Sequence, residues 1–326
     1  MKRIVSIVLC AVMILSALSL VACSGGKTLE FGLGVYTVAS ATGAEGDKNG
    51  QGKATVTVAA VTLDENGKIV ACALDTADNS VEFTSAGKAI AKESFATKYE
   101  QGDGYNMKAY GGAAKEWYEQ ADAFESVVVG KTTDEVKALV VAESKKGTDE
   151  VINAGCTIMV EEFAMAIVKA CENAKPSDAK ASNTVKVTAY TEQSITDAEG
   201  DKNGQNKLET TVFACALDAN GKVVACDTDC VQVAFGFDAK GASLFDASKG
   251  VFSKREQGDG YNMKAYGGAA KEWYEQADVF AAACIGKGAD EISAMLASDN
   301  YGDESLKSAG CTILVNGFVK AAAKIK

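Results

Sequence analysis

The stretch EQGDGYNMKAYGGAAKEWYEQAD occupies residues 100–122, and the same 23 residues return without change at 256–278. Shorter matches surround it at offsets of 154 to 156 residues: Ala44–Gln51 returns as Ala198–Gln205, and Ala154–Ile158 returns as Ala309–Ile313. Repeats at a spacing this long indicate a duplicated domain, since solenoid repeats are only 20 to 50 residues long.

The duplication divides the chain into two parts of similar length. We expect homologous domains at residues 35–171 and 185–326, because the matched stretches fall within these limits and in the same order. Residues 172–184 are mostly polar and include Pro176, the only proline of the chain, which is typical of a linker. With 326 residues, of which 47% are hydrophobic, the chain is long enough for two sizeable cores.

Each copy begins with the pattern of a β-hairpin. Apolar residues alternate through Val56, Val58 and Ala60, as in a strand with one buried face. Asn66-Gly67 separates this run from a second one, and Asn-Gly is a strong hairpin signal because both central turn residues then take positive φ. Asn220-Gly221 holds the same place in the second copy. Both copies are therefore expected to form antiparallel, hairpin-based sheets.

Helices are expected after the repeated stretch. Apolar residues from Ala113 to Val128 lie on one helical face, and Thr132–Glu135 has the spacing of a capping box that opens another helix. Cys156–Val160 has the pattern of a short strand, and Phe163 begins the apolar stripe of a last helix. The sequence therefore predicts an α+β fold in which each of two homologous domains packs helices against its sheet.

The first 22 residues have the pattern of a secretory signal peptide. Lys2-Arg3 is followed by an apolar run and then by Leu-Val-Ala-Cys23, which resembles the lipobox of bacterial lipoproteins. In this interpretation residues 1–22 are removed, Cys23 carries lipid, and residues 23–34 form a tether. The protein is then expected at the extracytoplasmic face of the cell membrane, held by its lipid anchor. The alternative is an ordinary signal peptide with a cysteine there by chance.

Composition and charge exclude several classes of function. The net charge is −11 and the sequence pI is near 4.8, so binding to a nucleic-acid backbone is not expected. The chain has no histidine, which excludes histidine-based catalysis and histidine metal sites. Glu45–Gly50 resembles the start of a calcium loop, but Val56 stands where that loop needs glutamate. We therefore expect no metal site and no catalytic residue, and a carrier or binding protein in preference to an enzyme.

The chain contains ten cysteines, and disulfides persist in proteins outside the cytosol. Counting back from the second Asn-Gly turn places Cys215 opposite Cys226, which makes this pair a disulfide candidate, with Cys226–Cys230 as the competing pair. In the first copy Val61 lies opposite Cys72, so no equivalent bridge is available there.

The repeated loop is the main candidate for a binding site. Its glycines permit sharp bends, and a loop does not need Tyr105, Asn106 or Met107 for packing. Trp117 lies on the apolar helical stripe, so a core position is the competing interpretation of that residue. Gly111-Gly112 precedes the expected helix, whose free N–H groups could bind a phosphate. The corresponding candidates of the second copy are Tyr261, Asn262, Met263 and Trp273.

A second motif, Ala-Gly-Cys-Thr, spans residues 154–157 and returns at 309–312. It resembles the Ser-Gly-Ala-Thr element of the FMN-binding domains found in extracellular electron-transfer lipoproteins and in the C subunit of sodium-pumping quinone reductases. The Asp-x-Asn-Gly-Lys hairpin, the Lys-Glu-Trp-Tyr-Glu-Gln helix and the lipobox are also similar to that family. The resemblance covers most of both domains.

The resemblance implies a flavin site in each copy. In the family, a transferase outside the cytosol attaches the FMN phosphate to the last threonine of the element. The residues implied here are Gly155, Cys156 and Thr157, with Gly310, Cys311 and Thr312. The family's serine is alanine in both copies, its alanine is cysteine, and Val151 and Leu306 replace an expected acidic residue. FMN is therefore expected either covalently at the threonine or non-covalently beside the repeated loop.

On this resemblance the protein is an electron carrier with two redox centres on one tethered chain, served by a flavin transferase and by membrane redox partners. Two alternatives remain open. One is a surface lipoprotein that binds another small ligand, such as a solute or a quinone, and the other is a structural surface protein without a cofactor. The colour of bound flavin would separate the first interpretation from the other two.

Overall fold

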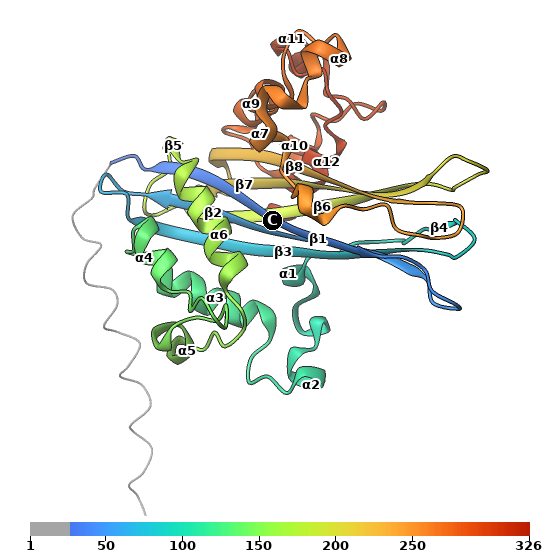
Figure 1. The fold of residues 1–326 in the computed structure, drawn as a ribbon. Coiled ribbons are helices and arrows are strands. Elements are labelled where there is room, and N and C mark those ends of the chain that lie inside the picture. The colour runs from blue at the N-terminus through green and yellow to red at the C-terminus, as the bar shows by residue number, and fades with distance from the viewer. Residues whose placement is uncertain (1–26) are drawn as a thin grey trace, which may run out of the picture.

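Two antiparallel sheets form the centre of the molecule, and the helices of each copy cover the outer face of its own sheet (Figure 1). The computed structural model describes residues 27–326, so the expected signal peptide and the lipidated Cys23 lie outside the described residues. Antiparallel sheets combined with separate helices confirm the predicted α+β class. The four layers follow the order helices, sheet, sheet, helices.

The first copy opens with a meander of three long strands. β1 (Glu30–Thr42), β2 (Gly50–Leu63) and β3 (Ile69–Phe83) pair as antiparallel neighbours, and the short strands β4 (Ala89–Ile90) and β5 (Lys175–Pro176) lie at the edges. The helical elements of this copy are α1 (Lys98–Gln101), η1 (Gly102–Tyr105), α2 (Met107–Gly111), α3 (Trp117–Val128), α4 (Thr133–Ala138), α5 (Asp149–Ala154) and α6 (Glu161–Glu172).

The second copy repeats this order of elements. Its sheet consists of β6 (Thr184–Thr196), β7 (Gly204–Leu217) and β8 (Val223–Phe237). Its helical elements are η2 (Ala247–Lys249), α7 (Lys254–Gln257), η3 (Gly258–Tyr261), α8 (Met263–Gly267), α9 (Trp273–Cys284), α10 (Ala289–Ser293), α11 (Glu304–Ala309), α12 (Asn316–Ala322) and η4 (Ala323–Ile325).

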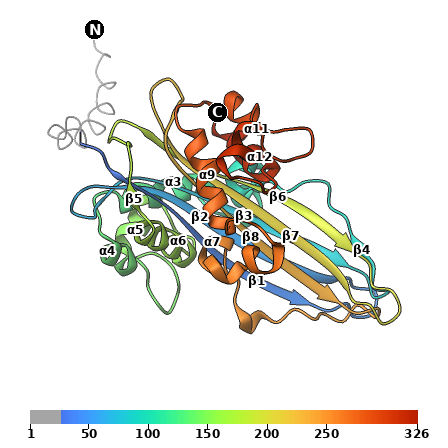
Figure 2. The same ribbon diagram turned by 90° about the horizontal axis from the view of Figure 1, so that it is seen from above.

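The inner faces of the two sheets are apolar and pack on each other. Val56, Val58 and Leu208 belong to this shared core and are at most 1% exposed. Phe83 and Phe237 hold equivalent positions in the two copies, and their rings stack with centroids 4.5 Å apart. Mutual contact between equivalent residues is typical of an isologous, twofold interface. In Figure 2 the strand axes of the two sheets are roughly aligned with each other.

The predicted hairpins are present, although their turns differ from the expected type. The Gly67 N–H donates to the Asp64 carbonyl at 3.0 Å, and the Asp64 N–H donates to the Lys68 carbonyl at 2.9 Å. In this turn only Gly67 has positive φ, at +69°, so the prediction of positive φ at Asn66 was wrong. The Asp64 carboxylate accepts from the Asn66 and Lys68 N–H groups and thereby supports the wider turn.

The start of α4 agrees with the sequence pattern, whereas the segment before α6 does not. The capping box is confirmed: the Thr132 hydroxyl and the Glu135 carboxylate bond to each other's N–H groups at the start of α4. The strand predicted at Cys156–Val160 is wrong, because only a single bridge, between Lys146 and Met159, forms there. This segment connects α5 to α6 and belongs to neither of the two sheets.

The polar segment between the copies lies along the edge of the first sheet. Lys175 and Pro176 pair with Phe31 and Glu30 as a two-residue strand. Further along, the Leu29 N–H donates to the carbonyl of the buried Ala179 at 2.8 Å. The segment is therefore fixed to β1 by backbone hydrogen bonds before the chain enters the second sheet.

Candidate functional site

Each copy contains a cavity between the outer face of its sheet and the repeated loop. The cavity of the second copy has a volume of about 520 Å³, and that of the first copy about 410 Å³. Both volumes fall in the range typical of small-molecule sites. The predicted residues that line them are Tyr105, Met107 and Trp117 in the first copy, and Tyr261, Met263, Trp273 and Thr312 in the second.

The repeated loop is held in shape by its own residues. Asn106 has the left-handed conformation, with φ of +61°, and its side-chain amide donates to the Gly104 carbonyl at 2.6 Å. The buried Glu116 carboxylate accepts from the N–H groups of Met107 and Lys108, the first residues of α2, at 2.8 and 3.2 Å. Asn106 therefore shapes the loop and does not line the cavity. Asn262 has the same geometry in the second copy.

This arrangement overturns the expectation of a phosphate site at the glycine pair. Gly111 is the last residue of α2, and Gly112 follows it with φ of +63°, so neither begins a helix. The helix that follows the pair, α3, begins only at Trp117, and there the Glu119 carboxylate accepts from the Glu116 N–H at 2.8 Å.

The tryptophan of each copy serves both as core and as cavity wall. Trp117 is 3% exposed and packs edge-to-face on Phe163, with centroids 5.6 Å apart. Trp273 contacts Phe318 in a tilted arrangement, at 5.7 Å. Both phenylalanines also line the cavities. The core interpretation of the tryptophans and the binding-site interpretation are therefore compatible.

A lysine that the sequence patterns did not single out lies over the aromatic wall of each cavity. The Lys98 ammonium is 5.1 Å from the ring centre of Tyr105 and 5.8 Å from that of Trp117. Lys254 lies 5.3 Å from Tyr261 and 5.4 Å from Trp273. A cation at these distances is attracted by the negative ring faces. Both lysines stand two residues before the repeated stretch, and this matched position was the signal that could have identified them.

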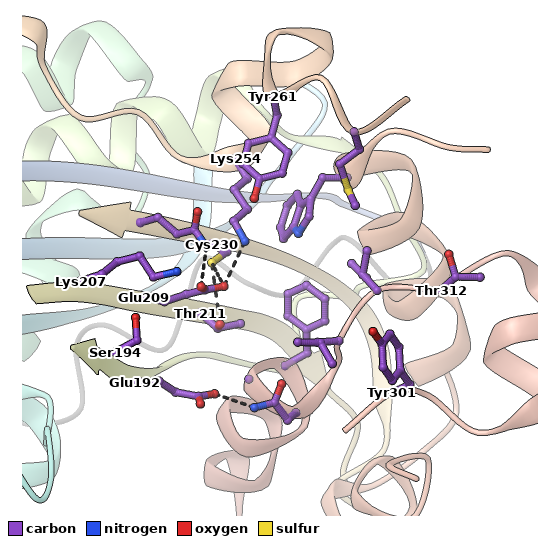
Figure 3. A pocket seen from close by; sticks show the side chains of 18 of the residues that line it. Glu192, Ser194, Lys207, Glu209, Thr211, Cys230, Lys254, Tyr261, Tyr301 and Thr312 are labelled. Atoms are coloured by element: carbon purple, nitrogen blue, oxygen red, sulfur yellow. Dashed lines mark hydrogen bonds and ion pairs between the residues drawn. The ribbon is translucent and has the colours of Figure 1, made fainter. Parts of the chain in front are cut away.

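The floor of the second cavity combines a carboxylate, a thiol and the lysine (Figure 3). The Glu209 carboxylate accepts from Lys254 at 3.0 Å and from the Cys230 thiol at 3.3 Å. Burial opposes the charge on Lys254, yet its pKa is raised because Cys230 and Glu209 lie beside the ammonium. Burial raises the pKa of the Cys230 thiol well above its usual value. At neutral pH this floor therefore holds an ion pair and a neutral thiol.

The first cavity pairs its lysine differently. Asp78 lies 3.5 Å from Lys98 and 3.1 Å from Lys53, and it accepts from the Thr55 hydroxyl at 2.9 Å. Burial alone would raise the pKa of Asp78, but Lys98 and Lys53 hold it below the usual value. Thr76 occupies the position equivalent to Cys230. The aromatic walls of the two cavities are thus the same, whereas the polar floors differ.

The two threonines of the second motif share one geometry. The Thr157 N–H and hydroxyl donate to Oε1 of Gln120 at 2.9 and 3.1 Å. The Thr312 groups donate to Oε1 of Gln276 at 2.8 and 3.0 Å. Both glutamines are 1% exposed, while both threonines are exposed. Thr312 lines the second cavity, and Thr157 lies outside the lining of the first.

The other residues of that motif have structural surroundings. Gly155 and Gly310 end α5 and α11 with φ of +103° and +100°, a conformation that favours glycine. Cys156 and Cys311 are fully buried, and burial raises the pKa of each thiol to about 11. None of these four residues lines a cavity.

The predicted register of the cysteines is confirmed. Cys215 lies opposite Cys226, and Val61 lies opposite Cys72. The disulfide candidate at this register is not formed: both thiols of the first pair are free, and the Cys226 thiol donates to the Ala281 carbonyl at 3.1 Å. The competing Cys226–Cys230 pair was a wrong prediction, since both lie on β8. Four residues of a strand span about 13 Å, beyond the reach of a disulfide.

Within residues 27–326, no group of three or more cysteine, aspartate or glutamate side chains is arranged to hold a metal ion. The calcium-like stretch forms a tight turn instead, with a bridge between Glu45 and Lys48. Across the same described part of the chain, none of the helices has both the length and the apolar character that a membrane span requires.

Comparison with known proteins gives one partial similarity. Over 95 residues the chain is 34% identical to the chlorophenol reductase of Desulfitobacterium hafniense. The matched region covers 25% of this chain and 29% of that protein. No family model and no solved structure matches the chain.

Proposed function

We propose that the protein is a lipid-anchored, FMN-binding electron carrier at the extracytoplasmic face of the cell membrane. The observation that carries this proposal is the presence of two equivalent cavities, each with a tyrosine–tryptophan–methionine wall and a lysine over the rings. The presence of this wall twice, on loops of identical sequence, suits a chain that holds the same ligand at two places.

The residues present fit a flavin mononucleotide. Its flat, apolar ring system matches the faces of Tyr261 and Trp273 together with the soft side chain of Met263. Lys254, whose side chain is 7% exposed and paired with Glu209, lies over these rings and faces the cavity. The cavities also have volumes suited to a ligand of this class.

When bound, FMN supplies reversible electron transfer, and the protein's groups orient and tune it. Lys254 places positive charge beside the ring site, which favours a ligand that gains negative charge on reduction. The aromatic wall restricts access of water from one side. The chain needs no acid–base residue of its own for this role, which agrees with the absence of histidine.

Covalent attachment at the threonines is part of the proposal for the second copy in particular. Thr312 is exposed, lines the cavity, and donates its hydroxyl hydrogen to Gln276, which leaves its oxygen lone pairs available. A flavin transferase outside the cytosol would be the partner for that step. Membrane redox proteins would be the partners for electron transfer, and Cys23 would carry the lipid.

The partial relative supports a redox role. It is named as a reductase, and the matched region is a minor part of each chain. The second candidate function is binding of a different small ligand, such as a solute or a quinone, by the same cavities. This second candidate rests on the differing floors, with Glu209 and Cys230 in one copy and Thr55 and Thr76 in the other.

The tryptophans allow each cavity to be tested separately, because the chain has only Trp117 and Trp273, one in each cavity. In a Trp117→Phe chain beginning at Ser24, FMN should quench the fluorescence of Trp273. Adding Tyr261→Ala should weaken FMN binding about five- to tenfold, as expected for loss of an aromatic contact. Tyr266→Ala is the matched control, because Tyr266 lies in the same loop but is 90% exposed.

Failure of FMN to quench either tryptophan would contradict the proposal. Quenching by a quinone but not by FMN would instead support the second candidate function. Equal effects of the two tyrosine variants would place FMN outside the cavity.

A further inference from the structure

Two ion pairs cross between the copies at equivalent positions. Lys169 of α6 pairs with Glu256 of α7, and Lys324 of η4 pairs with Glu100 of α1 at 2.7 Å. Each pair thus joins the last helical segment of one copy to the short helix that opens the repeated loop of the other. Reciprocal contacts of this kind are the signature of a twofold interface.

Each lysine is held in place by its own copy. The Lys169 ammonium also donates to the Val35 carbonyl at 3.0 Å and lies 5.4 Å from the ring centre of Tyr36. Lys324 donates to the Ala189 carbonyl at 2.7 Å and lies 5.7 Å from the ring of Tyr190. About a quarter of each lysine side chain is exposed, 26% and 24% respectively. The cations are therefore fixed on β1 and β6 before they meet the opposite copy.

Each glutamate completes the cap of a single helical turn. One oxygen of Glu256 accepts from the Ser253 N–H at 2.8 Å, while the other meets Lys169. Glu100 makes the same cap with the Thr97 N–H, at 2.9 Å, and its other oxygen meets Lys324. The opposite copy therefore fixes the rotamer of the capping carboxylate.

The capped helices carry the lysines of the two cavities. α7 has four residues and begins with Lys254, and α1 has four residues and begins with Lys98. A helix of one turn is not stable alone, so its position depends on outside contacts. Within its own copy α7 is anchored where the buried Asp229 carboxylate accepts from the Arg255 N–H at 3.1 Å. The Arg255 side chain adds ion pairs to Asp227 and Asp278 of the same copy, at 2.7 and 2.8 Å. The lysine from the opposite copy is the anchor that comes from outside the copy.

We propose that each copy positions the cavity lysine of the other: Lys169 holds the helix of Lys254, and Lys324 holds the helix of Lys98. In this view Lys169 and Lys324 are positioning residues that contact no ligand. Neither cavity is then complete within a single copy. The proposal concerns the shape of the cavities and holds for any ligand, so it does not depend on FMN.

The proposal also gives a physical reason for the duplication. A single copy would expose the inner face of its sheet and would lack the lysine that holds its cavity helix. Two copies in one chain supply both at once, and neither has to find a partner by diffusion.

Amide hydrogen exchange tests this cross-copy arrangement without any ligand. The repeated stretches give identical peptides, but residues 97–101 and 253–257 differ in sequence and can be followed separately. Lys169→Ala should speed exchange at residues 253–257 about fivefold, which corresponds to about 1 kcal/mol of local stability. Residues 97–101 should change less than about twofold. Lys324→Ala should give the opposite pattern.

Two controls separate positioning from general destabilisation. Lys131→Ala removes an ion pair to Glu150 within the first copy, at a lysine of similar exposure, 22%, and should leave both segments unchanged. Lys169→Arg keeps the charge and should restore slow exchange at residues 253–257. The proposal is overturned if Lys169→Ala leaves residues 253–257 unchanged, or if it speeds both segments equally.

Discussion

Glu125 provides a stringent test of the structure, because its carboxyl group is half-buried on α3 without a cation among its hydrogen-bond and ion-pair partners in the described residues. Its Oε1 accepts from the Leu74 N–H at 2.6 Å. Burial raises the pKa of Glu125 to about 8, and the neighbouring Asp122 and Asp75 add to the rise although the Leu74 hydrogen bond opposes it. The second copy has Ala281 at this position, so the fold does not require the carboxylate.

A raised pKa makes the stability of the protein fall as the pH rises. The folded state binds the Glu125 proton more tightly than the unfolded state, whose pKa is near the usual 4.5. The stabilisation that protonated Glu125 gives the folded state is therefore complete below pH 4.5 and is lost as the pH rises through 8. One pKa unit corresponds to about 1.4 kcal/mol, so the free energy of unfolding should fall by about 1 kcal/mol from pH 6.5 to pH 7.5 because of Glu125.

This pH window is almost free of other titrations. The chain has no histidine, and burial raises the pKa of Asp75 and Asp229 only to about 6. Above about pH 6.5 these two groups therefore add only a few tenths of a kcal/mol to the loss of stability. Urea unfolding of the chain from Ser24 at pH 6.5 and 7.5 measures the difference. Glu125→Gln keeps an acceptor for Leu74 and should remove most of the decline. A wild-type stability that is constant over this window, or a variant that keeps the full slope, would refute a raised pKa of Glu125.

Three further predictions concern the shared core, the threonine segment and the cysteines. Phe83→Ala removes a fully buried ring from the stack with Phe237, and urea unfolding should show a loss of about 3–5 kcal/mol; Phe83→Leu should lose less than half as much. Gln120→Leu deprives Thr157 of its acceptor and should cost about 1–3 kcal/mol, with faster proteolysis near that residue; unchanged proteolysis would argue against the bond. Alkylation of the denatured, unreduced chain should modify all eight cysteines of the described residues; two unmodified cysteines would show a disulfide.

Local patterns in the sequence predicted the elements well, because their causes are local. The Asn-Gly turn places the hairpin, and a bulge between Ala216 and Leu217 brings Cys215 opposite Cys226 although the turn is wider than expected. A capping box starts α4 as its spacing required. The segment after Gly155 was misjudged, since a short apolar run can also be a buried connection between helices. Nothing in the run itself shows that no neighbouring strand is present.

The arrangement of the copies could not be predicted, because it depends on contacts distant in sequence. Every residue from Val58 to Leu63 on β2 is buried, on one face by helices and on the other by the second sheet. Alternation alone does not say which layer covers which face. Lys98 and Lys169 likewise have the sequence context of ordinary surface lysines, and their roles become visible only where rings and carboxylates of other segments meet them.

The central claim is that each copy holds one FMN in its aromatic cavity. The most direct measurement is the visible absorption of the chain from Ser24 after saturation with FMN and removal of free flavin, compared with the protein concentration. We predict one bound FMN for each cavity, and loss of one of them when Lys254 and Tyr261 are both replaced by alanine. A colourless protein after saturation would contradict the claim.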